Sequence, residues 1–131
     1  MTATFIINAK RSAVAPRMGA LAQLELHELA APVIQSLLSE LDIAPEPVDE
    51  VIVSNALGAG GNPARVIALA SGLPERIAGL TIDRQCVGGL DAIGIAKAMV
   101  SSGAANIVIA GGVERLSQLY CCIHFIPRLA R

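Results

Sequence analysis

The feature that most constrains this chain is the alternation of short runs rich in Val and Ile with longer stretches of helical periodicity. Uninterrupted apolar runs, such as residues 51–53 and 107–109, are typical of strands covered on both faces, as in a parallel sheet. The sequence predicts strands over residues 5–7, 50–55, 80–82 and 106–110. Helices between them give the order β-α-β-α-β-α-β, which favours an α/β fold with a mostly parallel sheet.

Two helices are indicated by periodicity and by end signals. Residues 26–41 place apolar side chains three and four positions apart over four turns, and this helix is expected to start near His27. In the second helix, Asn62 has the side chain of an N-cap, Pro63 suits the first helical position, and Gly72 follows the end. Each of these helices lies between two of the predicted strands.

A third helix is predicted from about residue 86 to residue 102, where Gly103 ends it. This segment is apolar almost all round. Such a composition is typical of a helix that is buried between layers.

Composition excludes several classes of protein. With 131 residues, 53% hydrophobic and 16% charged, the chain has the size of one domain and is too apolar to be disordered. The uncharged stretch 98–113 contains serine, glycine and asparagine, so it does not predict a membrane span. A net charge of -1 gives no reason to expect nucleic acid or a lipid surface as a partner. Three cysteines and the lack of a secretory signal favour a cytoplasmic location.

Cys86 is the strongest candidate for chemistry. It follows the predicted strand 80–82 and leads into the third helix, where unpaired N–H groups and the positive end of the helix dipole favour a thiolate. Gly88 and Gly89 let an acyl group approach the backbone closely, and free N–H groups there can hold an oxyanion. The local pattern leaves two interpretations open, a nucleophile or a small buried apolar side chain.

Three sequence blocks occur in order: residues 60–65 (GGNPAR), 83–90 (DRQCVGGL) and 110–114 (AGGVE). Upstream segments that fit the same pattern are 11–13 and 19–21, after the first strand, and 48–52, at the entry to the second. In these blocks the chain resembles the N-terminal part of the thiolases, which are acetyl-CoA acyltransferases, over about residues 4–118. The resemblance implies a thiolase-like N-terminal half that is incomplete, because the family's half-domain has a further strand.

The resemblance also implies a chemistry. In thiolases the cysteine matching Cys86 attacks a 3-ketoacyl-CoA and becomes acylated, the carbon–carbon bond breaks, and acetyl-CoA leaves. A second CoA thiol then takes the acyl group, and the reverse direction is a Claisen condensation. The implied substrates are coenzyme A thioesters of fatty acid metabolism, with no tightly bound cofactor, and the backbone N–H of Cys86 helps to form an oxyanion hole. A homo-oligomer is implied as well, because the strand matching residues 80–82 commonly pairs with its twin in a dimer.

The chain departs from the family beside the cysteine and in its extent. Asp83 stands where asparagine is more usual, Val87 where a small residue is preferred, and Gly88 where serine or threonine is preferred. The family's histidine followed by proline, its second cysteine followed by glycine, and its CoA-binding insertion have no match. Because acid/base help contributes about 10²–10⁴-fold, we expect this truncated chain to have little or no thiolase activity alone.

The last residues differ in composition from the rest. Residues 119–131 hold two of the three cysteines and two of the three aromatic residues. We therefore predict a boundary at Gln118, between a partial thiolase N-terminal domain (1–118) and an atypical tail (119–131) that is frameshifted or disordered. Cys121, Cys122 and His124 fit no standard zinc pattern, so no metal site is expected.

Three further features have both a structural and a functional interpretation. Residues 58–61 (GAGG) precede a helix but lack the full fingerprint of a phosphate loop, so a tight strand-to-helix turn is favoured. Glu114 either orders the loop after the fourth strand or forms a solvated pair with Arg115. His27 is expected at the surface near the start of the first helix, with no catalytic role.

Three functional hypotheses follow. The first is a truncated acyltransferase of the thiolase type with Cys86 as the acyl carrier. The second is a non-catalytic, thiolase-derived fragment that self-associates or binds a full-length thiolase through the third strand. The third is a decarboxylating condensing enzyme of the same superfamily, against which residues 62–65 and 110–114 favour a thiolase.

Overall fold

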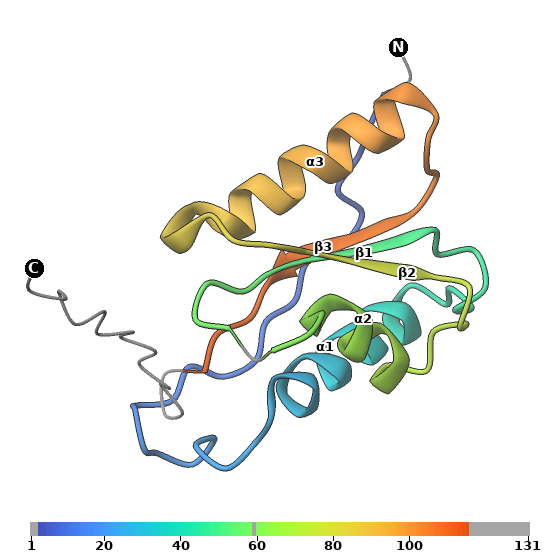
Figure 1. The fold of residues 1–131 in the computed structure, drawn as a ribbon. Coiled ribbons are helices and arrows are strands. Elements are labelled where there is room, and N and C mark those ends of the chain that lie inside the picture. The colour runs from blue at the N-terminus through green and yellow to red at the C-terminus, as the bar shows by residue number, and fades with distance from the viewer. Residues whose placement is uncertain (1–2, 59, 116–131) are drawn as a thin grey trace, which may run out of the picture.

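A three-stranded parallel sheet lies between helices in the computed structural model, which describes residues 3–58 and 60–115 (Figure 1). In chain order the elements are α1 (Leu26–Glu40), β1 (Glu50–Ser54), α2 (Pro63–Ala70), β2 (Ala78–Ile82), the 3₁₀ turn η1 (Gln85–Val87), α3 (Gly88–Ser102) and β3 (Val108–Gly112). Helices α1 and α2 cover one face of the sheet and α3 covers the other (Figure 1). The predicted α/β fold with a parallel sheet is confirmed.

Strand β1 is the centre of the sheet, which has the order β2-β1-β3. In the register, Ile52 lies between Leu80 on β2 and Ala110 on β3. Side chains alternate along a strand, so Val51 and Val53 face one helical layer while Ile52 faces the other. Val51 and Ile52 are fully buried, as the uninterrupted Val and Ile run predicts.

The main core lies between β1 and the layer formed by α1 and α2. Its members are aliphatic side chains from these elements and from the loops that enter β1 and β2. They are Ile34, Leu38, Val48, Val51, Val53, Ala64, Ile67, Ala68, Leu73 and Ile77. The apolar stripe of the first helix therefore points into the core, as its periodicity predicts.

The start of α2 is fixed to β2 by polar side chains. The Asn62 Oδ1 atom accepts from the Arg65 backbone N–H at 3.3 Å, which confirms the predicted N-cap. Its amide nitrogen also donates to the Gly79 carbonyl at 2.6 Å, and the Arg65 guanidinium donates to the carbonyl of Glu75 at 2.8 Å. A Cβ atom on Gly79 would lie 2.3 Å from the Arg65 nitrogen, so only glycine permits this close approach.

Helix α1 begins one residue before the predicted position. The Glu25 backbone N–H donates to the Glu28 carboxylate at 2.7 Å, one half of a capping box that sets the start at Leu26. His27 is the second residue of the helix and is half-buried, close to the expected place.

The prediction of a strand over residues 5–7 is wrong. Phe5, Ile6 and Ile7 are 77%, 76% and 62% exposed and join no ladder, because the segment is held by side chains from two different helices. At one end Thr4 shares a 2.9 Å hydrogen bond with Ser101 of α3, and at the other Lys10 donates to Ser36 of α1 at 2.8 Å. The described order therefore begins with a helix.

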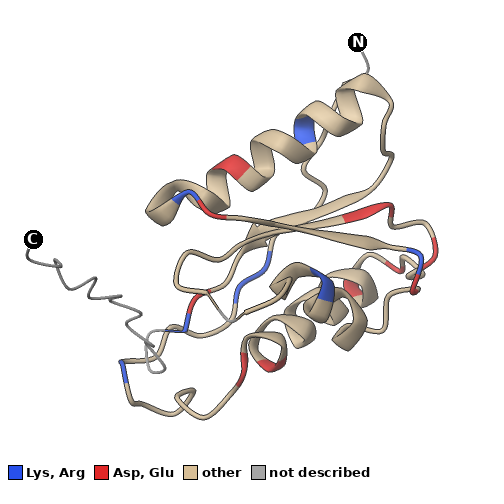
Figure 2. Ribbon diagram, in the orientation of Figure 1, with Lys and Arg blue, Asp and Glu red and all other residues tan. Residues whose placement is uncertain are grey.

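Helix α3 is less covered than its composition predicts. Only Gly88 and Ala92 are buried, and its outer face exposes Leu90 and Ile93, because no second layer lies over it in residues 3–58 and 60–115. Charge is sparse along this helix, which carries Asp91 and Lys97 (Figure 2). Within the described part of the chain, no helix has the length and apolar character needed to cross a membrane.

Strand β3 begins two residues later than predicted because the two residues before it donate their backbone N–H groups to the Asp49 side chain. Its carboxylate accepts from the Asn106 and Ile107 N–H groups at 2.6 and 3.1 Å. These two hydrogen bonds hold the pKa of Asp49 below its usual value, with Asn106 as the larger cause. Asp49 thus joins the chain just before β1 to the chain just before β3.

Replacing Asp49 with alanine is expected to lower the urea midpoint of unfolding at neutral pH, because two backbone donors lose their acceptor. A carboxyl with a depressed native pKa stabilises the fold above its unfolded pKa, and this contribution is lost as the pH falls through the native value. The difference between Asp49→Ala and the parent should therefore shrink in acid. Glu75→Ala, on an exposed side chain, is the matched control; a pH-independent difference would contradict the assignment.

Candidate active site

The carboxyl ends of the parallel strands meet at one edge of the sheet, and Cys86 lies in the turn that leaves this edge. Strand β2 ends at Ile82, and Cys86 follows in η1, directly before α3. Its thiol is free and exposed. The structure thus places Cys86 at the start of the third helix, and excludes a buried apolar side chain at this position.

A side-chain hydrogen bond shapes the turn that carries Cys86. The Asp83 carboxylate accepts from the Gln85 backbone N–H at 3.0 Å and so closes a turn in the three residues after the strand. Gln85 takes a φ of 50°, in the left-handed region that residues with a Cβ rarely adopt. The Val87 N–H then donates to the Arg84 carbonyl at 3.2 Å and closes the 3₁₀ turn.

Backbone N–H groups and charged side chains surround Cys86 along the chain. Within the described residues the Cys86 N–H donates to no acceptor, so it is available to a group bound beside the thiol. The neighbouring charges, Arg84 and Asp91, neutralise one another, with the Arg84 Nε atom 3.0 Å from the Asp91 carboxylate. Cys86 also precedes the positive end of the α3 dipole and follows the Asp83 carboxylate, which is bonded to Gln85 in the same turn.

The first turn of α3 is packed against the ends of β1 and β3. Gly88 is buried, and a Cβ atom built on it would lie 1.7 Å from the Ser54 Oγ atom. A Cβ on Gly112 would lie 3.6 Å from the Ser54 Cβ and 3.7 Å from the Gly89 Cα, in ordinary contact. Ser54, at the end of β1, therefore lies directly against the turn that follows Cys86.

Glu114 connects the loops that follow β1 and β3. Its carboxylate accepts from the Ala56 backbone N–H and, at 3.2 Å, from the Asn55 side-chain amide, which also donates to the Val113 carbonyl at 3.0 Å. The structure therefore favours the ordering role of Glu114 over a solvated pair with Arg115.

Arg115 was not identified as a structural residue from the sequence. Only 6% of its side chain is exposed, and its Nη1 atom lies 2.8 Å from the Glu25 carboxylate. No guanidinium nitrogen makes an aligned hydrogen bond within the described residues, so this contact is an ion pair without hydrogen-bond alignment. It joins the end of β3 to the start of α1, a pairing for which adjacent sequence gives no signal.

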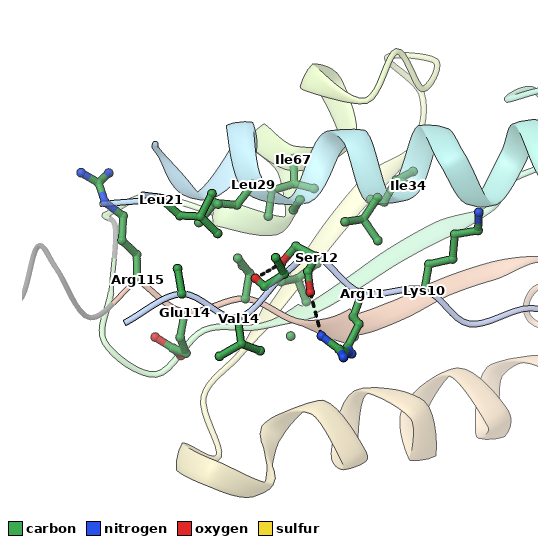
Figure 3. A pocket seen from close by; sticks show the side chains of 18 of the residues that line it. Lys10, Arg11, Ser12, Val14, Leu21, Leu29, Ile34, Ile67, Glu114 and Arg115 are labelled. Atoms are coloured by element: carbon green, nitrogen blue, oxygen red, sulfur yellow. Dashed lines mark hydrogen bonds between the residues drawn. The ribbon is translucent and has the colours of Figure 1, made fainter. Parts of the chain in front are cut away.

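A cavity of about 420 Å³ lies between residues 10–17, α1 and the end of β3 (Figure 3). Its walls are largely apolar and include Leu29, Ile34 and Ile67. Cys86 does not line it, and α3, into which Cys86 leads, packs on the opposite face of the sheet. The cavity is therefore separate from the thiol.

The residues that follow β1 form a tight turn, as predicted for residues 58–61. Gly58, Gly60 and Gly61 have positive φ angles between 63° and 74°, as a tight turn between β1 and α2 requires. Cys121, Cys122, His124 and the predicted boundary at Gln118 lie outside the described residues. In the part that is described, no three His, Cys, Asp or Glu side chains gather as metal ligands.

Fold and site together define a class: an α/β protein with a free thiol at the start of a helix, at the carboxyl edge of a parallel sheet. The family model described as "Thiolase, N-terminal domain" matches residues 4–128, and the chain belongs to the thiolase family. The matched region contains Cys86 and all the described elements.

The names of three curated relatives agree with this family. The chain is 41% identical over 125 residues to an acetyl-CoA acetyltransferase of Allochromatium vinosum, covering 94% of this chain and 31% of the relative. It is 45% identical over 113 residues to the putative acetyl-CoA C-acetyltransferase YhfS of Bacillus subtilis, covering 86% and 30%. It is 42% identical over 122 residues to the steroid 3-ketoacyl-CoA thiolase FadA6 of Mycobacterium tuberculosis, covering 91% and 30%.

A solved structure agrees with these matches. The crystal structure of the Bacillus anthracis acetyl-CoA acetyltransferase superimposes with a TM-score of 0.69 at 40% identity, covering 72% of this chain and 24% of that one. The chain spans about 30% of the length of the curated relatives it matches. The predicted likeness to an incomplete N-terminal half of a thiolase is confirmed.

Replacing Glu114 with alanine is expected to speed hydrogen exchange at the Ala56 amide, because that N–H loses its acceptor. One hydrogen bond contributes about 1 kcal/mol, which corresponds to a roughly fivefold faster rate. Glu114→Gln keeps an acceptor oxygen and should show a smaller change. Amide exchange followed by NMR measures this, and equal rates in the parent and Glu114→Ala would exclude the ordering role.

Proposed function

We propose that Cys86 is the acyl-accepting nucleophile of a thiolase-type acyltransferase that acts on 3-ketoacyl-CoA. The observation that carries the proposal is the free, exposed thiol at the start of α3, beside an N–H without an acceptor in the described residues. The substrate class is supported by the relatives, whose names are acetyl-CoA acetyltransferases and a steroid 3-ketoacyl-CoA thiolase. Such chemistry fits fatty acid metabolism in the cytoplasm.

The Cys86 thiolate adds to the C3 carbonyl of a 3-ketoacyl-CoA, and the oxygen takes the electron pair as an oxyanion. The Cys86 N–H, which has no acceptor among the described residues, donates to this oxygen in the proposed step. When the carbonyl re-forms, the C2–C3 bond breaks, its electrons move to C2, and protonation there releases acetyl-CoA. The thiol of a second CoA then loses its proton, attacks the Cys86 thioester, and leaves as acyl-CoA while the Cys86 thiolate is regenerated.

Acid/base groups for this sequence are not brought to Cys86 by the described residues. His27 lies in α1, on the opposite face of the sheet from α3. We propose that the 131-residue chain alone accepts an acyl group slowly and does not turn over, because general acid/base help is worth about 10²–10⁴-fold.

A second candidate function is non-catalytic association. The outer face of α3 and the turn before it expose Val87, Leu90 and Ile93, at 52%, 69% and 42%. Strand β2 is at an edge of the described sheet, where its outer backbone groups have no partner strand. These two features support a fragment that forms a homo-oligomer or binds a full-length thiolase through β2.

Incubation with acetoacetyl-CoA is expected to add one acetyl group at Cys86, detected by intact mass and by the mass of the peptide that contains Cys86. Cys86→Ala, which keeps Cys121 and Cys122, is the control and should acquire at least tenfold less label. Equal labelling of both proteins, or none of either, would contradict the nucleophile. In the second case, concentration-dependent association in sedimentation experiments would support the non-catalytic function.

Steady-state thiolysis is expected to be absent or slower by about 10²–10⁴-fold than that of a full-length relative, because the described residues bring no acid/base group to Cys86. The assay follows the loss of acetoacetyl-CoA with and without free CoA. CoA-dependent cleavage at the relative's rate would overturn this expectation.

A further inference from the structure

Ser54, at the end of β1, lies against Gly88 in the first turn of the helix that follows Cys86. Ser54 is buried with 5% exposure, and a Cβ built on Gly88 would lie 1.7 Å from the Ser54 Oγ and 2.7 Å from the Ser54 Cβ. Real Cβ atoms do not come this close to a neighbour, so the serine side chain occupies the space that a side chain at position 88 needs.

The neighbouring glycine has no such contact. A Cβ on Gly89, one position further along the same turn, would meet no atom within 4 Å. The restriction is therefore specific to position 88, which faces β1, and does not apply to the first turn of α3 as a whole.

We propose that Ser54 is a positioning residue for Cys86: its side chain fills the space beside residue 88 and fixes the first turn of α3, with its N–H groups, relative to the sulfur. This inference rests on the proposed role of Cys86. In this chain the hydroxyl stands on the adjoining strand at Ser54, and position 88 has none.

If Ser54 acts in this way, the hydroxyl-bearing side chain can stand at either position 54 or position 88 and fill the same space. A single change at either position leaves the contact empty or overfilled, whereas exchanging the two residue types restores one hydroxyl-bearing side chain in the same space. The first turn of α3 moves in each single variant, so the helix-end field at the Cys86 sulfur weakens. The double variant returns the turn to its place.

The test is the alkylation rate of Cys86 with iodoacetamide over a pH series, followed on the peptide that contains Cys86. Ser54→Gly and Gly88→Ala should each slow alkylation about two- to fivefold, the size of a helix-dipole contribution. Gly94→Ala, further along α3 where a Cβ would meet no atom within 4 Å, is the matched control and should react like the parent. The double variant Ser54→Gly/Gly88→Ser should recover the parent's rate and pH profile.

Folding is checked by circular dichroism and urea midpoints. If Gly88→Ala does not fold, Ser54→Gly and the double variant decide the question. Parent-like alkylation of Ser54→Gly, or a double variant no faster than Ser54→Gly, would overturn the positioning role. Alkylation needs no acyl transfer, so this failure is distinct from a failure of Cys86 to accept an acetyl group from acetoacetyl-CoA.

Discussion

The pairing of β1 with two parallel neighbours is the constraint on which the rest of the described structure depends. Its central position buries both faces of the strand, with Val51 and Val53 in the core beneath α1 and α2 and Ile52 toward α3. Helix α2 joins β1 to β2 on one face of the sheet, and α3 joins β2 to β3 on the other, so both crossovers return the chain to the same edge of the sheet. The edge where the strands end is consequently the place where loops and helix starts converge.

Polar side chains at this edge join the segments that follow different strands. Glu114 accepts from the loop after β1, and Ser54 at the end of β1 packs against the turn after Cys86. Arg115 adds an ion pair to the start of α1. These contacts hold together the junction of strands and helix at which the thiol stands, in a chain that spans about 30% of the length of its curated relatives.

Local signals in the sequence predicted those features that are determined by residues close together in the chain. The Asn62 cap, the Val and Ile run of β1 and the place of Cys86 between a strand and a helix are of this kind. Two predictions failed because they depend on remote partners: residues 5–7 pair with neither edge strand of the sheet, and α3 has no second layer within the described residues. The links from Glu114 to Ala56 and from Ser54 to Gly88 join distant positions, so no spacing rule indicates them.

The order of the strands has a consequence for how the sheet closes. Ile52 pairs with Leu80 on one side and with Ala110 on the other, so the loop closed by β1 and β3 is roughly twice as long as the loop closed by β1 and β2. Each doubling of loop length costs about 0.6 kcal/mol of chain entropy. The β1–β3 ladder thus closes at the higher entropic cost. Asp49, just before β1, bonds Asn106 and Ile107, just before β3. Once these hydrogen bonds have formed, fewer residues remain to be ordered when β3 pairs with β1.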